Sequence, residues 1–279
     1  MRVVVTGGSG LLGRRVMSRL AGEHDVVNLD IRSSRDDVGE FVRCDILDRS
    51  GVARALRGAT AVVHAAALPG PSFGTPQELR TVNTDGTAEV ARAALEAGAQ
   101  RFIHISSESV LGFVFGDGEE RPRYLPIDEG HPTSPSEPYG NSKFVAETLL
   151  EHQIGNALPL VILRPPWIWV PSEYDRYRTL VESPDQWAAG LWAYVHGDDV
   201  AEAVARVLTA ELPIGVHTAY VCAPDNGTIY PTAELVEKWY PDLTLPGGFP
   251  EYGSLISSDT LAALTGFRPA MRWREFLTA

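Results

Sequence analysis

The chain alternates short apolar runs with longer segments in which apolar residues recur every three or four positions. A continuous run such as Val3-Val4-Val5 is typical of a parallel strand buried on both faces, and the longer spacing is typical of amphipathic helices. Such alternation indicates an α/β fold built on a doubly wound parallel sheet with right-handed crossovers. The pattern predicts strands at 2–6, 25–30, 41–44, 60–66, 101–106 and 159–164, and helices at 11–21, 49–57, 77–98 and 139–153.

Two irregular stretches and a changed C-terminal pattern interrupt this alternation. Residues 68–75 and 112–138 are rich in Pro, Gly and Ser, and long loops that follow strand ends commonly form ligand sites. Aromatic and proline residues then gather from 165 to 192, before a helix at 198–210, a strand at 216–222 and a helix at 232–239. We predict a sheet domain of residues 1–165, to which 193–222 return, and a small C-terminal substrate lobe of residues 166–192 and 223–279.

A glycine-spaced turn follows the first predicted strand. Gly7, Gly10 and Gly13 stand at three-residue spacing, and a predicted helix begins at Leu11. In such a turn the glycines permit a tight bend, a close approach to a pyrophosphate and close helix packing, while the helix N-terminus offers N–H groups to phosphates. Asp30 ends the second strand, 20 residues after Gly10, where a carboxylate can hydrogen-bond the adenosine ribose. The stretch therefore predicts a dinucleotide site.

Charge and cysteine content narrow the partners. The formal net charge is −12 and no basic run offsets it, which argues against nucleic acid or an anionic membrane surface. Cys44 and Cys222 are the only cysteines, so we expect no disulfide scaffold, no cysteine-based metal site and a reducing compartment. No apolar run approaches membrane-spanning length, and the glycines at 7–10 interrupt any leader-like run. We therefore predict a soluble, cytoplasmic protein without a metal.

The candidate chemistry lies at Tyr139 and Lys143. They stand four residues apart on a predicted helix, hence on one face, and Lys143 is one of only two lysines in the chain. An ammonium group beside a phenol favours the phenolate, so we expect Lys143 to lower the Tyr139 pKa toward the range of a general acid/base. The strand at 101–106 ends at Ser106-Ser107, where a hydroxyl can orient a substrate oxygen toward Tyr139.

Together these motifs resemble the extended short-chain dehydrogenase/reductase family, which includes nucleotide-sugar epimerases, dehydratases and some sugar dehydrogenases. The resemblance covers most of the chain. It implies a Rossmann fold with a small C-terminal lobe, and a catalytic group of Ser107, Tyr139 and Lys143. The blocks that match, in the family's order, are Thr6–Gly13, Asp45-Ile46, Val63–Ala67, Asn83–Thr87, Ser106–Gly112, Tyr139 with Lys143, Leu163–Pro165 and Val195–Val200.

The resemblance also implies a cofactor and an assembly. We expect NAD, because the Asp30 carboxylate would repel the 2′-phosphate of NADP, although Arg14 and Arg32 keep NADP as an alternative. In this family the helix that carries the Tyr/Lys pair and the preceding long helix commonly form a dimer face, so we expect a homodimer through residues 139–153 and 77–98. The residues implied to contact NAD are Gly7, Gly10, Leu11, Leu12, Gly13, Asp30, Arg32, Asp45, Ile46, Ala65, Ala66, Ala67, Ser106, Tyr139, Lys143 and Pro166.

Departures from the family favour a small sugar-like substrate. Epimerases of nucleotide sugars usually carry an asparagine and an arginine for the diphosphate where this chain has Trp167 and Trp192. A diphosphate needs cationic or N–H partners, so a nucleotide sugar loses support. Glu108 can repel a uronic acid or accept hydrogen bonds from a polyol. The residues expected to contact the substrate are Leu68, Glu108, Ser109, Trp167, Tyr174 and Arg176.

The sequence therefore predicts an NAD-dependent oxidoreductase that transfers hydride at a secondary alcohol or ketone. Two alternatives stay open: an epimerase or dehydratase that retains its cofactor, and a non-catalytic NAD-binding regulatory protein. The Ser/Tyr/Lys set argues against the second, because a scaffold has no need for it. We interpret His64 and His196 as structural. Aromatic residues in such a lobe are more often core than pocket, and those of this lobe are Trp167, Trp169, Tyr174, Tyr177, Trp187 and Trp192.

Overall fold

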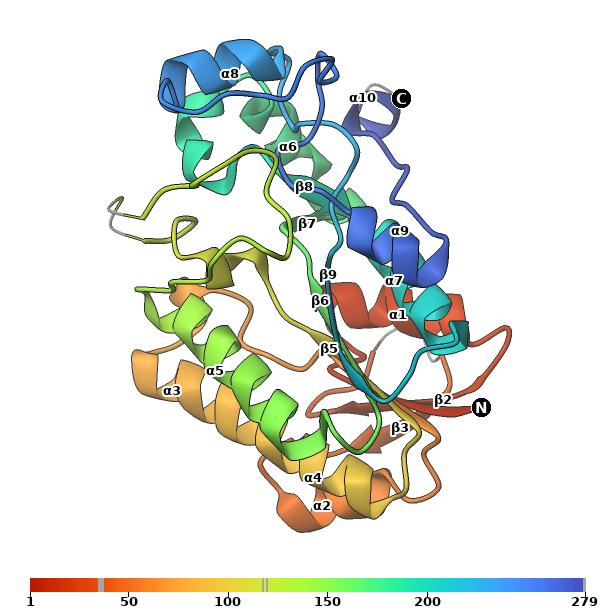
Figure 1. The fold of residues 1–279 in the computed structure, drawn as a ribbon. Coiled ribbons are helices and arrows are strands. Elements are labelled where there is room, and N and C mark those ends of the chain that lie inside the picture. The colour runs from red at the N-terminus through yellow and green to blue at the C-terminus, as the bar shows by residue number, and fades with distance from the viewer. Residues whose placement is uncertain (35–37, 117, 119, 278–279) are drawn as a thin grey trace.

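A seven-stranded parallel sheet organises the chain (Figure 1). The structure, a computed structural model, describes residues 1–34, 38–116, 118 and 120–277, so two positions of the predicted irregular stretch 112–138 lie outside the described residues. The strand order is β3-β2-β1-β4-β5-β6-β9, and each neighbouring pair is parallel. The predicted doubly wound α/β sheet is thereby confirmed. Its strands are β1 (Arg2–Thr6), β2 (Asp25–Asp30), β3 (Glu40–Arg43), β4 (Ala61–His64), β5 (Arg101–Ile105), β6 (Pro159–Arg164) and β9 (Gly215–Tyr220).

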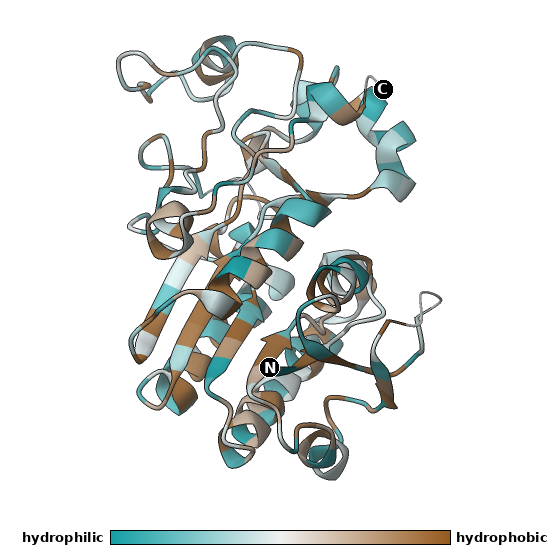
Figure 2. Cartoon of the chain, turned by 90° about the vertical axis from the view of Figure 1, so that its right-hand side faces the viewer, coloured by the Kyte–Doolittle hydropathy of each residue, from teal (hydrophilic) through white to brown (hydrophobic). Residues whose placement is uncertain are grey.

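Helices cover both faces of the sheet, because successive strand residues point to opposite sides. Val3 and Val5 share one apolar core with residues of α1 (Leu11–Leu20) and α7 (Gly197–Thr209). Val4 belongs to a second core with residues of α2 (Arg49–Ala55), α4 (Gly86–Glu96) and α5 (Pro138–Ile154). Figure 2 shows the apolar colour concentrated on the central strands that lie between these two layers.

The helix predicted at 77–98 contains a change of winding. It consists of α3 (Pro76–Arg80), a π-helical turn at Thr81–Asp85 and α4. The hydrophobic pattern cannot separate these forms, since one wider turn changes the register by a single residue. Such turns are frequent at functional sites. Here the wider turn carries Asn83, which lies buried between two elements of the candidate site.

The small lobe lies beyond the carboxyl end of β6, at one end of the sheet (Figure 1). It contains a parallel pair of three-residue strands, β7 (Trp167–Trp169) and β8 (Tyr194–His196), that the sequence pattern did not predict. Its helices are α6 (Tyr174–Leu180), α8 (Thr232–Trp239) and α10 (Trp273–Phe276). Residues 223–279 were assigned to this lobe, but α9 (Asp259–Thr265) packs on α7, and its Leu261 joins the core of the sheet domain.

Most aromatic residues of the lobe pack in its core. The Trp169 ring stacks on Tyr177 with their centroids 4.3 Å apart, and both side chains are fully buried. Trp192 is fully buried too, and its Nε1 donates to Pro184 O at 2.9 Å. Leu125, from the irregular stretch 112–138, is buried in the same core. The lobe and that stretch therefore fold as one apolar unit.

Both cysteines are buried and free. Within the described ranges, no cluster of three or more potential metal ligands is present. No helix among the described residues is both long and apolar enough to cross a membrane.

Candidate active site

The glycine turn packs closely against the end of β4. Gly7 has φ +72°, a left-handed conformation that favours glycine, and a Cβ there would lie 2.7 Å from backbone atoms of Ala66. A Cβ at Gly13 would collide with the carbonyl oxygen of Gly7. A Cβ at Gly10 would meet only that oxygen, at 3.2 Å, so its other side is open. The turn therefore provides the cradle that a pyrophosphate needs, directly before the N-terminus of α1.

Backbone donors hold Asp30 beside this turn. Its Oδ2 accepts a hydrogen bond from Ser9 N at 3.1 Å, and its Oδ1 accepts one from Arg32 N at 3.2 Å. Asn28 fixes the turn from below, because its Nδ2 donates to Ser9 Oγ at 3.0 Å. Asp30 is half-buried, while Arg32 is exposed. A carboxylate thus stands at the end of β2, which fits the position of a ribose-binding acid.

The other residues expected along NAD lie where β3 and β4 end. Asp45 is exposed, and its Oδ1 accepts a hydrogen bond from Leu47 N at 2.9 Å. Ile46 is buried against α4, where its Cδ1 would lie 2.6 Å from a Cβ on Gly86. Ala65–Ala67 are half-buried. Because the carboxyl ends of parallel strands share one edge, the structure places these residues on the same edge as the glycine turn.

Asn83 connects the loop after β4 with α5, and the sequence analysis missed it as a site residue. Its Oδ1 accepts a hydrogen bond from Leu68 N at 2.8 Å, and its Nδ2 donates to Leu68 O at 3.1 Å. The same Nδ2 donates to Ser142 Oγ at 3.0 Å. The backbone N–H and C=O groups of Leu68, an expected substrate contact, are therefore both hydrogen-bonded to Asn83. The available signal was the block Asn83–Thr87, which the sequence analysis had matched to the family.

The end of β5 and the first turn of α5 place Ser107 next to Tyr139. Ser107 caps a short 3-10 turn at residues 108–111, and its Oγ accepts hydrogen bonds from Ser109 N at 3.1 Å and Ser109 Oγ at 2.9 Å. Tyr139 N donates to Glu137 Oε2 at 2.7 Å, which fixes the start of the helix. A hydrogen bond from the Ser107 hydroxyl lowers the pKa of the Tyr139 phenol, against the larger effect of burial. The predicted serine and tyrosine therefore meet.

The pKa of Tyr139 differs from the expectation. Burial raises it to about 12, and the negative charges of Glu137 and Glu108 act in the same direction. Lys143 shares the helix face, but its Nζ donates to the carbonyl oxygen of Ile105 at 2.9 Å. The ammonium group is thus directed at β5, and the expected lowering of the Tyr139 pKa by Lys143 is not seen, because burial dominates.

Lys143 lies one helical turn from a buried ion pair that the sequence analysis missed. Burial lowers the Lys143 pKa to about 8, while the charge of Glu147 opposes that shift. Arg164 donates to both carboxylate oxygens of Glu147, from Nε to Oε1 at 3.0 Å and from Nη2 to Oε2 at 2.6 Å. Ser106 Oγ also donates to Glu147. The signal in the sequence was the spacing of Glu147, four residues after Lys143 on the same helix face.

Glu108 and Ser109 continue the turn that Ser107 begins. Glu108 N donates to Pro165 O at 3.0 Å, which ties this turn to the end of β6, and the next residue, Pro166, is buried. The side chain of Glu108 is itself buried, and burial raises its pKa well above the usual range of a glutamate. The structure thus brings Ser106, Ser107, Glu108, Ser109, Tyr139, Lys143 and Pro166 to one place.

The remaining expected substrate contacts form a separate group in the lobe. Tyr174 hydrogen-bonds His196 Nε2 through its hydroxyl at 2.9 Å, and its ring stacks on Phe276 with centroids 5.0 Å apart. The exposed Arg176 lies with its guanidinium carbon 4.7 Å from the centre of the Trp167 ring. No hydrogen bond, ion pair or ring contact among the described residues joins these side chains to the catalytic serine and tyrosine.

Two histidines that we interpreted as structural are buried and hydrogen-bonded. His64 Nδ1 pairs with Thr6 Oγ1 at 2.7 Å and its Nε2 with Thr87 Oγ1 at 2.8 Å. Burial lowers the His64 pKa to about 3, so the ring stays neutral. His196 Nδ1 accepts a hydrogen bond from Asp198 N at 3.2 Å, and burial lowers its pKa too. These contacts agree with structural roles.

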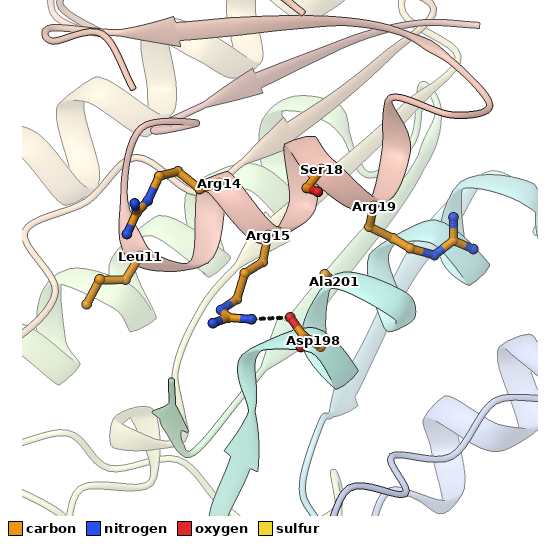
Figure 3. Close-up of a pocket in the computed structure, with 7 residues that line it drawn as sticks. All are labelled: Leu11, Arg14, Arg15, Ser18, Arg19, Asp198 and Ala201. Carbon is orange, nitrogen blue, oxygen red and sulfur yellow. Dashed lines mark hydrogen bonds and ion pairs between the residues drawn. The ribbon is translucent and has the colours of Figure 1, made fainter. Parts of the chain in front are cut away.

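A groove of about 430 Å³ lies between α1 and α7 (Figure 3). Arginine side chains from α1 line it, but Arg15 pairs with Asp198 and Arg19 pairs with Glu202. No member of the Ser/Tyr/Lys group lines this groove. Leu11, an expected NAD contact, does line it, so the groove borders the glycine turn and is separate only from the Ser/Tyr/Lys group.

The fold and the site define a class of enzyme. A doubly wound sheet with a glycine cradle, a carboxylate at the end of β2 and a Ser/Tyr/Lys group is the arrangement of the short-chain dehydrogenases/reductases. The family model of the NAD dependent epimerase/dehydratase family matches residues 3–181, and the chain belongs to this family, within the extended short-chain dehydrogenases/reductases. The family is described as NAD dependent, and the chain spans little more than half the length of the first curated relative that it matches.

Relatives and solved structures agree with this class. The chain is 34% identical over 197 residues to a 4-hydroxy-2-methyl-3-oxo-4-farnesyl-3,4-dihydroquinoline-1-oxide ketoreductase of Stigmatella aurantiaca, covering 64% of this chain and 56% of that protein. It is 28% identical over 218 residues to an L-arabinose 1-dehydrogenase (NAD(P)(+)) of Haloferax volcanii, covering 76% of this chain and 84% of that protein. The fold matches a short-chain dehydrogenase/reductase superfamily protein from Agrobacterium tumefaciens with a TM-score of 0.76 at 23% identity, covering 100% of this chain and 95% of that one.

Proposed function

We propose that this enzyme transfers hydride between NAD and a secondary alcohol or ketone of a small, sugar-like molecule. The observation that carries the proposal is the meeting of Ser107 and Tyr139 at the end of β5, with Lys143 one turn further along α5. These three residues are the ones to which the family resemblance assigns proton transfer. The two named relatives support it, because one is a ketoreductase and the other a sugar dehydrogenase.

In the oxidative direction Tyr139 takes the proton from the substrate hydroxyl through its phenolic oxygen. Bound NAD supplies the acceptor for the hydride that leaves the same carbon, so the alcohol becomes a ketone. Ser107 hydrogen-bonds the substrate oxygen and keeps it close to the phenol. Lys143 stabilises the phenolate in its charged form when the ammonium turns from Ile105 O toward the site. In reduction Tyr139, with a pKa of about 12, is a neutral proton donor.

NAD fits the cradle described above. The turn at Gly7, Gly10 and Gly13 would hold the pyrophosphate, and Asp30 the adenosine ribose. Asp45 and Ile46 would lie at the adenine. Lys143 would hydrogen-bond the nicotinamide ribose, and Pro166 would lie near the nicotinamide ring, as the family resemblance implies.

A second candidate is an epimerase or dehydratase that oxidises its substrate transiently and keeps its cofactor. The family description favours it, because the family includes both activities. One structural feature weighs against a nucleotide-sugar epimerase. Trp192 stands where such enzymes carry an arginine for the diphosphate, and its indole N–H is already committed to Pro184 O. A diphosphate would find no donor at this residue.

A screen for NADH formation separates the two candidates. The purified enzyme and NAD are given free sugars, polyols, uronic acids and nucleotide sugars, and absorbance reports NADH. Mass analysis identifies any nucleotide that copurifies. The proposal predicts NADH release with a free sugar or polyol and little retained cofactor. Tightly retained NAD with no NADH release would instead support the epimerase.

We also propose that the enzyme is a homodimer through α5 and the helix formed by α3 and α4. The outward face of α5 carries an apolar group: Val145 is 40% exposed, and Phe144 and Leu149 are half-buried. Light scattering at micromolar concentration checks this, and a monomer would contradict it. A cytoplasmic location, inferred from the cysteine content, stays a prediction.

A further inference from the structure

Glu108 stands apart from the other buried carboxyl groups of the described chain. Glu147 is bonded to Arg164 and Ser106. Asp199 accepts hydrogen bonds from two backbone N–H groups, and Asp225 is bonded to a tyrosine and an arginine. The side chain of Glu108 has no hydrogen-bond or ion-pair partner among the described residues, although the residue is only 5% exposed.

An unpaired buried carboxyl group needs an explanation. Removing a polar group from water without a new hydrogen bond is unfavourable, and removing a charged group is more so. The backbone of Glu108 offers no relief, because its N–H is fixed on Pro165 O at 3.0 Å. Unsatisfied buried groups in folded proteins are few, and they concentrate where a ligand completes the bonding.

Among the described residues, the carboxyl group of Glu108 is the nearest group to the Cβ position of Gly190. A Cβ built on Gly190 would have Glu108 Oε1 at 4.0 Å and no other heavy atom within that distance. Burial is the only cause of the raised Glu108 pKa, so no cation among the residues that the structure describes compensates its charge. The titratable groups that sense its charge are Tyr139, from α5, and Cys222, after β9. The carboxyl group therefore lies between the catalytic tyrosine and the lobe.

The turn that carries Gly190 is held in a strained conformation. Leu191 and Trp192 have φ values of 53° and 52°, in the left-handed region that is unfavourable for residues other than glycine. Trp192 is fixed from two sides, by its own bond to Pro184 O and by Gly227 N, which donates to Trp192 O at 2.8 Å. Backbone strain of this kind clusters at ligand sites, so the turn is a second, independent sign of a binding surface opposite Glu108.

We propose that Glu108 selects the substrate: its carboxyl group hydrogen-bonds a hydroxyl of an uncharged sugar or polyol held between Ser107 and Gly190, and it rejects a substrate that places a carboxylate or phosphate there. This inference rests on the proposed function. A hydroxyl both donates and accepts, so it satisfies the carboxyl group in either protonation state. An anionic substituent would instead lose its water beside a buried carboxyl group, with no cation among the described residues to offset its charge.

Matched sugar pairs test the proposal, because each pair differs only in a hydroxymethyl or a carboxylate group. The pairs are D-galactose with D-galacturonate and D-glucose with D-glucuronate. Wild type is compared with Glu108→Gln, Glu108→Leu and Gly190→Ala, and Glu151→Gln removes an exposed charge on α5 as the control. Two readouts are taken on the NAD-loaded enzyme: sugar binding by calorimetry, and NADH formation. Unchanged NAD affinity in each variant checks that the fold is intact.

Wild type should bind a neutral sugar at least about 100-fold more tightly than its uronate, because a site built to hydrogen-bond one group rejects the wrong one strongly. Glu108→Leu should lose about 100-fold in affinity for the neutral sugar, and Glu108→Gln should narrow the discrimination about tenfold while keeping the neutral sugar. Gly190→Ala should weaken both sugars by filling the space beside Oε1.

Three results would overturn the proposal: equal binding of a sugar and its uronate by wild type, an unchanged neutral-sugar affinity in Glu108→Leu, or no binding of any sugar in the panel. Selective binding without NADH release would leave Glu108 as the selecting residue and remove the proposed dehydrogenase activity, so the two failures are distinguishable.

Discussion

The two sides of the candidate site differ in how their buried carboxyl groups are bonded. On the side of the sheet, Glu147 is bonded to Arg164 and Ser106, and at most 10% of either side chain of the ion pair is exposed. On the side of the lobe, Glu108 is equally buried and has no partner among the residues that the structure describes. Only one residue, Ser107, lies between Ser106, the partner of the first carboxyl group, and Glu108, which carries the second.

This difference separates two tasks. The bonded side is complete without a substrate, so it can hold the helix and strand that carry Lys143 and Ser107 in fixed positions. On the unbonded side the Glu108 carboxyl group has no hydrogen-bond partner among the described residues, so a ligand can supply one. We infer that the sheet side serves the chemistry, which the family shares, and that the lobe side serves selection, which is particular to this chain.

Removing the phenolic oxygen on the catalytic side should have the largest effect. We expect Tyr139→Phe to reduce turnover by about 10²–10⁴-fold, the usual consequence of losing a general acid/base. NAD affinity should stay nearly unchanged, because the ring is retained. Steady-state rates and a cofactor titration measure both quantities. Near-normal turnover would refute Tyr139 as the proton donor and acceptor.

Breaking the bonded carboxyl should cost stability. Glu147→Gln leaves the buried Arg164 without its counter-charge, and we expect a loss of about 3–5 kcal/mol in the free energy of unfolding. The double variant Glu147→Leu with Arg164→Met removes both charges and should recover most of that loss. Urea denaturation measures each variant. A loss below 1 kcal/mol in the single variant would mean that this side is not held by the ion pair.

The fold could be read from the sequence because its strands are continuous apolar runs, such as Val3–Val5, buried on both faces. The same reasoning could not find β7 and β8. Each has three residues, and their pairing joins positions that are far apart in the chain. Such short strands have no measurable period. The π-helical turn at 81–85 was missed for a related reason, since its apolar spacing is that of an ordinary helix.

The site divides in the same way. Ser107, Tyr139 and Lys143 lie on two predicted elements at recognisable spacing, so the sequence could place them together. The pKa of Tyr139 depends on burial, and the spacing of Tyr139 and Lys143 does not report burial. The unpaired state of Glu108 is likewise a property of its three-dimensional neighbours. Tyr174 and Arg176 were expected at the substrate but contact lobe residues, because aromatic packing positions them.

The nucleotide end of the site should show a smaller effect, on cofactor choice. We expect NAD to be preferred over NADP by about 10–100-fold, because Asp30 repels the 2′-phosphate. Asp30→Asn keeps the size of the side chain and removes the charge, so the preference should fall about tenfold. Asp25→Asn, at the other end of β2, is the control. Steady-state kinetics with NAD and with NADP measure this preference. A preference for NADP in wild type would contradict the assignment of NAD as the cofactor.

The unbonded carboxyl should show the smallest effect, and one that depends on pH. Burial holds the Glu108 pKa above its ordinary value of 4.5, so its contribution to stability is full below about pH 4.5 and is lost as pH rises through the folded-state pKa. Glu108→Gln should therefore gain about 1 kcal/mol over wild type at pH 8 and less at pH 5. Denaturation at both pH values tests this, and equal differences at the two would contradict an unpaired carboxyl.

The most direct test of the proposed reaction follows a deuterium atom. The enzyme is given NAD with D-galactose that carries deuterium at all of its carbon-bound positions, and separately UDP-galactose labelled at C4. Mass analysis then locates the label, with Tyr139→Phe as the inactive control. We predict that deuterium from the free sugar appears in released NADH and that UDP-galactose keeps its label and its configuration. Epimerised UDP-galactose, with no label released from the free sugar, would contradict the proposed dehydrogenase.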